Sequence, residues 1–172
     1  RGGHTVGLVT PLYAVVRERF PEIRRLGMEL DLPLGPRRVG GSVWSLESAA
    51  GFTVYFVEAP VFYERAGLYQ EGGVDYEDNA ERFIFFCKAV VETLRLGNFA
   101  ADIVHCHDWQ AALLPVLLRE AERRHHVTLA LKTIFTIHNI AYQGVFPAKT
   151  FSRTNLPDEL FHMDGIEYYG QI

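Results

Sequence analysis

Two short polar segments of the chain carry the residue types that could do chemistry. His107, Asp108 and Trp109 follow one apolar segment, and His138 and Asn139 follow the next. A carboxylate accepts hydrogen bonds from hydroxyl groups, an asparagine amide both donates and accepts, and an indole ring presents a flat apolar face. Such a set suits a polyhydroxylated ring, such as a pyranose.

Each of these residues also has a structural interpretation. Asp108 could cap a helix that begins near Ala111, a role that is compatible with ligand contact. Trp109 could be a packing residue, and His138 could be a hydrogen-bonded histidine of the core. The residue types alone leave these alternatives open.

A metal site is the other chemistry that the histidines suggest. His105 and His107 lie on the same face of a predicted strand, a spacing that can ligate a metal. No further His or Cys follows at short spacing to complete the site. A structural or orienting role is therefore favoured for both.

The elements that must position these residues can be predicted from the spacing of apolar side chains. Apolar segments of strand length occupy residues 5–10, 102–107 and 133–137, and helical spacing extends over 78–96 and 111–124. Strands that alternate with helices predict an α/β fold with a Rossmann-like parallel sheet and helices on both faces. Ligands bind such a sheet beyond the carboxyl ends of its strands, where both polar segments fall.

The segments before the first long helix are less regular. Residues 43–47 and 53–57 predict a hairpin around the turn at 48–51. Residues 27–42 are rich in glycine and proline and are predicted to form a loop, and so is the polar segment 67–78.

Composition excludes several classes of protein. The 172 residues are 48% hydrophobic and 22% charged, which excludes a disordered chain, a coiled coil and a collagen-like fibre. The net charge is −4 and no Lys/Arg run exceeds two residues, so a nucleic acid partner is not expected. No apolar run approaches the roughly 20 residues of a membrane span, and two distant cysteines indicate a reduced, intracellular protein. The abrupt start at Arg1 and end at Ile172 indicate an internal piece of a larger protein.

Six segments, taken in order, resemble the N-terminal catalytic domain of bacterial glycogen synthases and plant starch synthases, glycosyltransferase family 5. They cover most of the chain, and the His-Asn-x-Ala-Tyr-Gln-Gly pattern is the most specific of them. The six segments are residues 55–60, 67–69, 76–83, 105–109, 135–144 and 165–172.

The resemblance implies an enzyme that transfers glucose from ADP-glucose to the 4-hydroxyl at the non-reducing end of an α-1,4-glucan, with retention of the α configuration. It implies the GT-B fold, in which two Rossmann-like halves flank a cleft. Residues 1–172 would be a single partial domain within the N-terminal half, incomplete at both ends. The opening strand with its Lys-x-Gly-Gly-Leu loop and the C-terminal Rossmann-like domain would lie outside these residues, and we expect residues 1–172 alone to be inactive.

The resemblance also assigns roles to individual residues. His138 matches the position that contacts the donor glucose, and we assign catalytic roles to His138 and Asp108. Asp108, Trp109 and Tyr76 match positions on the acceptor side, and Asn139 is expected to hold the backbone of His138. Position 110 is Gln where some members carry His, so we assign it no proton-transfer role.

The expected partners are ADP-glucose and an α-1,4-glucan such as glycogen or a maltooligosaccharide, with no cofactor, metal, nucleic acid or membrane. We expect a location in the bacterial cytoplasm, or in a plastid for a plant enzyme. Two alternatives remain. One is another GT-B transferase, such as a sucrose-synthase-like or trehalose-type enzyme, and the other is a non-catalytic glucan-binding module.

Overall fold

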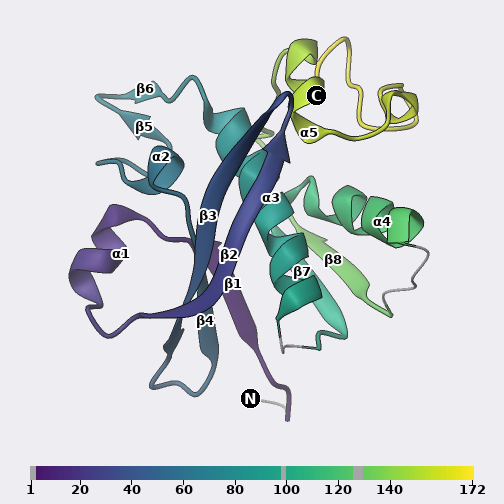
Figure 1. Cartoon of the computed structure of the whole chain (residues 1–172). Helices are drawn as coiled ribbons and strands as arrows, with labels where there is room; N and C mark the ends of the chain where they lie inside the picture. Colours follow the sequence, from purple (N-terminus) through teal and green to yellow (C-terminus); the bar gives the residue numbers. More distant parts are fainter. Residues whose placement is uncertain (1–2, 98–99, 126–129) are drawn as a thin grey trace.

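The computed structural model describes residues 3–97, 100–125 and 130–172 of the chain (Figure 1). Its strands form a mixed four-stranded sheet in the order β1-β4-β3-β2, a parallel pair β7-β8 and a small hairpin β5-β6. The strands are β1 (Gly7–Pro11), β2 (Arg24–Leu34), β3 (Arg37–Glu47), β4 (Thr53–Glu58), β5 (Gln70–Glu71), β6 (Val74–Asp75), β7 (Ile103–His107) and β8 (Lys132–Thr136).

Two long helices and several short ones complete the structure. The α-helices are α1 (Ala14–Arg19), α2 (Pro60–Tyr63), α3 (Asn79–Leu96), α4 (Leu114–His125) and α5 (Phe151–Thr154). Short 3-10 turns are η1 (Trp109–Ala111), η2 (Ala148–Thr150) and η3 (Asp158–Leu160). None of the helices in the described residues is long and apolar enough to cross a membrane.

Helix α3 organises the core. It runs through the middle of the molecule, between the β2-β3 hairpin on one side and β7, β8 and α4 on the other (Figure 1). Apolar residues at helical spacing, among them Phe83, Phe86 and Val90, are buried in the larger core cluster. The helix ends where the sequence predicts, with Gly97 at its C-cap.

Side chains on the two faces of β4 pack into different clusters. Val57 belongs to the core cluster that includes α3, whereas Val54 and Phe56 pack with Leu12 and Ile23, next to α1. Helix α3 therefore covers one face of the four-stranded sheet, and on the other face the short helix α1 contributes only the partly buried Val16. Parallel pairing is confirmed for β1 with β4 and for β7 with β8.

The prediction of a loop over residues 27–42 is wrong, because these residues belong to the long antiparallel hairpin of β2 and β3. The structure explains three of the glycine and proline residues individually. Pro33 is tolerated because β2 is an edge strand, and Gly35 makes the turn at φ +63°. A side chain at Gly41 would collide with the Glu58 carbonyl and press on the ring of Phe85 in α3.

The other strand predictions agree with the structure within a few residues. The hairpin predicted around residues 48–51 is the β3-β4 pair, in which Glu47 faces Thr53. Within the polar loop predicted over residues 67–78, only the two-residue strands β5 and β6 pair. The last segment, after β8, is mostly irregular, and the backbone of Phe146 exchanges two hydrogen bonds with Ile172.

A candidate ligand-binding edge at the ends of two parallel strands

The candidate site lies where the parallel strands β7 and β8 end. Their register pairs His107 with Thr136, so the residues that follow each strand leave the sheet side by side. The Asp108 amide continues the pairing and donates to the Thr136 carbonyl over 2.9 Å. The Asp108 carboxylate then accepts a 2.7 Å hydrogen bond from the His138 amide. One aspartate therefore joins the two polar segments.

The helix-cap interpretation of Asp108 is wrong. Asp108 stands at the N-terminus of η1, but its side chain makes no cap hydrogen bond there. The longer helix α4 begins only at Leu114. The Asp108 carboxylate bonds the His138 amide across the strand pair instead of capping a helix.

The backbone of Asp108 is strained. Its φ is 55° and its ψ is −177°, a region that is populated almost only by glycine. Such a conformation costs on the order of 1–3 kcal/mol and concentrates at active sites and ligand clamps. Here it turns the carboxylate of Asp108 toward the amide of His138.

His138 is exposed, which contradicts the alternative that it is a buried core histidine. Its Nε2 lies 2.9 Å from Nδ1 of His107, and the planes of the two rings differ by 19°. His105 lies against His107 at 4.2 Å between ring centroids and hydrogen-bonds Thr136 through its Nε2. Three imidazoles therefore line the strand ends.

The charged form of His107 is disfavoured. Loss of contact with water, followed by the neighbouring His105 and His138, lowers the pKa of His107, and Asp108 opposes this only in part. The described residues contain no group of three or more His, Cys, Asp or Glu side chains arranged to hold a metal ion. The cluster is described best as an array of hydrogen-bonded rings.

Trp109 is half-buried among other aromatic rings. Phe83 meets it edge-on at 4.8 Å, and Phe146 lies 5.5 Å away between centroids. A Cβ atom at Gly144 would come within 2.5 Å of the indole, so the loop after β8 sits directly against the ring. The structure supports the packing alternative for Trp109, and contact with a sugar stays a prediction.

The expectation that Asn139 holds the backbone of His138 is wrong. Its side-chain oxygen accepts from the Ala141 amide over 3.0 Å and so shapes the turn that follows. The His138 amide is held by Asp108 instead. An asparagine side chain readily bonds the backbone two residues further on, which explains the difference.

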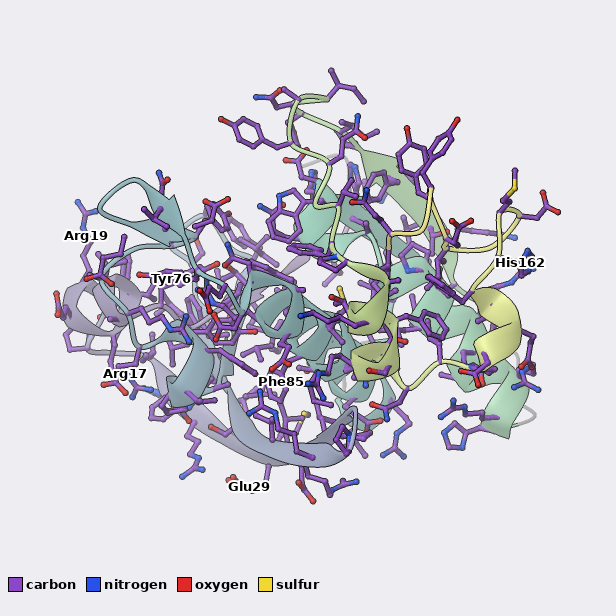
Figure 2. The ribbon with its side chains drawn as sticks, turned by 90° about the horizontal axis from the view of Figure 1, so that it is seen from above. Arg17, Arg19, Glu29, Tyr76, Phe85 and His162 are labelled. Atoms are coloured by element: carbon purple, nitrogen blue, oxygen red, sulfur yellow. The ribbon has the colours of Figure 1, made fainter. Side chains whose placement is uncertain are left out.

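Tyr76 comes from a different part of the fold (Figure 2), near α2 and the β5-β6 hairpin. Its hydroxyl accepts from the Gly67 amide over 3.1 Å, and the guanidinium groups of Arg65 and Arg82 lie over its ring at 4.7 and 4.9 Å. The same loop reaches the candidate site through Tyr69, whose ring is 6.5 Å from that of Trp109. The acceptor role of Tyr76 itself stays a prediction.

Sequence reasoning missed Arg82, the largest fully buried side chain among the described residues. Its guanidinium donates to the carbonyls of Phe62 and Leu68 and to the side chain of Asn79. Burial lowers its pKa, and the hydrogen bonds compensate for the lost water. The sequence feature that could have identified Arg82 is its position directly before the apolar residues of α3. Arg82 fixes the loop that carries Tyr69.

Polar groups beyond the carboxyl ends of parallel strands are typical of Rossmann-like domains that bind a ligand there. Residues 1–172 match the family described as the starch synthase catalytic domain. The chain belongs to this family. It is 51% identical over 171 residues to a glycogen synthase of Opitutus terrae and 38% identical to glycogen synthase 2 of Geobacter sulfurreducens.

Solved structures agree with the sequence relatives. The catalytic domain of starch synthase IV from Arabidopsis thaliana, bound to ADP and acarbose, superposes with a TM-score of 0.85 at 26% identity. That match covers 100% of this chain and 35% of the starch synthase chain. The match to the Opitutus relative covers 99% of this chain and 36% of the relative. This chain therefore spans about a third of the length of the proteins that it matches.

Proposed function

We propose that this chain positions the sugars in a retaining glucosyltransferase that moves glucose from ADP-glucose to the 4-hydroxyl of an α-1,4-glucan. The observation that carries the proposal is the Asp108–His138 clamp at the strand ends, in a chain of the starch synthase catalytic domain family. The names of the bacterial relatives and the ADP and acarbose bound to the plant structure support both substrate classes.

The chemistry sets clear demands on such a site. A retaining transfer without a protein nucleophile passes through an oxocarbenium-like state, with the departing phosphate close to the incoming hydroxyl. The protein must orient both sugars, exclude water and stabilise the separated charge. In this proposal His138 lies beside the donor glucose, and Asp108 fixes it there. Trp109 and Tyr76 belong to the acceptor side.

We propose that the reaction needs neither a metal nor an organic cofactor and takes place in the bacterial cytoplasm. Cationic side chains outside these residues would neutralise the diphosphate, so residues 1–172 by themselves would not transfer glucose. Removal of divalent metals with EDTA should then leave the transfer rate of the full-length protein unchanged.

Incorporation of labelled glucose into glycogen by the full-length protein tests the proposed function. ADP-glucose and UDP-glucose are compared as donors. A maltooligosaccharide, fructose and a glucose phosphate are the acceptors in parallel reactions. Transfer from ADP-glucose to the glucan supports the proposal. Transfer to fructose or to a glucose phosphate would assign another GT-B activity, and glucan binding without transfer would assign a binding module.

A further inference from the structure

His107 lies next to Asp108 and has no role in the proposed function. We propose that His107 is a positioning residue, which holds the His138 ring through a direct hydrogen bond and fixes which His138 nitrogen carries the hydrogen. This inference rests on the proposed function, because it concerns the ring placed beside the donor glucose.

The strand register brings these two rings together. His107 is the last residue of β7 and faces Thr136, the last residue of β8, and His138 lies two residues beyond Thr136. His107 Nδ1 and His138 Nε2 are 2.9 Å apart, an ordinary hydrogen-bond distance. The near-parallel rings, 5.2 Å apart between centroids, restrict rotation of His138. The backbone of His138 is already held by Asp108, so both its main chain and its ring are fixed.

The hydrogen bond has a chemical consequence for the other nitrogen of His138. Two imidazole nitrogens at this distance share one hydrogen, so one ring donates and the other presents a lone pair. If His138 donates from Nε2 and is neutral, its Nδ1 is an acceptor, and if it accepts at Nε2, its Nδ1 is a donor. Whether His107 donates or accepts at this contact therefore decides how His138 meets a sugar hydroxyl.

His105 supports the arrangement from the other side. Its ring lies 4.2 Å from that of His107, and its own Nε2 is tied to the Thr136 hydroxyl. The titratable groups that face His107 are His105, His138 and Asp108. A ring held between two others has little freedom to adopt a second orientation, so His107 is a rigid partner for His138.

Two substitutions of His107 separate the hydrogen bond from the ring. His107→Phe keeps an aromatic ring but removes the nitrogen, and His107→Asn places an amide near the position of Nδ1. In the full-length protein we expect kcat to fall roughly 10- to 100-fold in His107→Phe, the scale of a misplaced reacting group. The KM for the glucan should change little, and His107→Asn should recover much of kcat. His4→Asn, at an exposed histidine before β1, is the control.

Nitrogen-15 NMR of the imidazoles supplies a readout that does not depend on turnover. We expect a single tautomer of neutral His138 in the wild type and a mixture in His107→Phe. The same single tautomer in both proteins, or a wild-type kcat in His107→Phe, would overturn the inference. If His138→Ala lowers kcat while His107→Phe does not, only the positioning role fails. If His138→Ala has a normal kcat, the proposed site fails as well.

Discussion

At the scale of single residues, Asp108 determines the geometry of the candidate site. Its carboxylate bonds the His138 amide, and its own backbone adopts a conformation that suits glycine. The two features have opposite effects on stability, because the strain costs free energy and the hydrogen bond to a charged group contributes it. Substitutions at this position can therefore separate the strain from the function.

Three variants of Asp108 should differ in stability and activity. Asp108→Ala keeps the strain and loses the bond, so it should be the least stable. Asp108→Gly loses the same bond but relieves the strain, so its free energy of unfolding should be about 1–2 kcal/mol higher than that of Asp108→Ala. Asp108→Asn keeps an acceptor oxygen and should stay closest to the wild type. Urea unfolding and kcat measure the series, and equal stability of the Ala and Gly variants would contradict the strained backbone.

Gly144 is the residue through which the loop after β8 meets Trp109. Gly144→Ala places a methyl group 2.5 Å from the indole at φ +63°, and we expect a loss of about 3 kcal/mol or more from strain and overpacking together. Gly72→Ala is a matched control, because Gly72 has φ +60° and no atom within 4 Å of the added methyl. Chemical denaturation of both variants measures the difference. Equal losses would mean that the Trp109 contact is unimportant.

The sequence predicts only part of the geometry of the candidate site. The polar types at positions 108 and 138 and their place after two strands predict that they lie together. The sequence does not predict that Asp108 rather than Asn139 holds the His138 amide, because both side chains can accept a backbone hydrogen bond. It also does not place Tyr76, whose ring depends on two arginines from other segments.

At the scale of elements, a buried lysine joins α3 to the rest of the fold. Lys88 Nζ donates to the Pro33 carbonyl of β2, to the Arg153 carbonyl of α5 and to the Asn155 side chain. Burial, and to a smaller extent the charge of Arg124, lowers the pKa of Lys88 to about 7. The unfolded chain therefore binds more protons than the folded chain above this pH.

Stability should consequently depend on pH through Lys88. Because the folded-state pKa is below the unfolded value of about 10.4, the free energy of unfolding should rise as pH increases from about 7 toward 10. The slope is at most about 1.4 kcal/mol per pH unit. Lys88→Met should remove this rise, and Lys149→Met, at an exposed lysine, should keep it. Urea unfolding across this pH range is the measurement, and identical slopes in all three proteins would contradict the prediction.

Elements with uninterrupted apolar spacing are predictable from the sequence. This holds for α3, β7 and β8, whose apolar residues mark the elements in the sequence even though β8 has no buried residue in the structure. The β2-β3 hairpin is not predictable in this way. Gly41 is needed in β3 because a side chain there would collide with the Glu58 carbonyl of β4 and the ring of Phe85 in α3. A glycine that permits close packing has the same sequence appearance as a glycine in a loop.

At the scale of the whole molecule, the strand pair β7-β8 and the segment after β8 carry exposed apolar side chains. Ile103 and Ile134 on β7 and β8 are 55% and 46% exposed, and Ile140 and Tyr142 beyond β8 are 67% and 70% exposed. Exposed apolar side chains of this size are typical of places where other protein or ligand packs. This agrees with a chain that spans about a third of its relatives' length.

The proposed function depends most directly on the place of His138 beside the transferred glucose. The decisive measurement is kcat and the KM for the glucan in full-length His138→Ala, with circular dichroism to establish that the variant is folded. If His138 contacts the donor in the transition state, kcat should fall roughly 100-fold or more while the KM for the glucan changes little. A folded His138→Ala variant with a wild-type kcat would contradict the account.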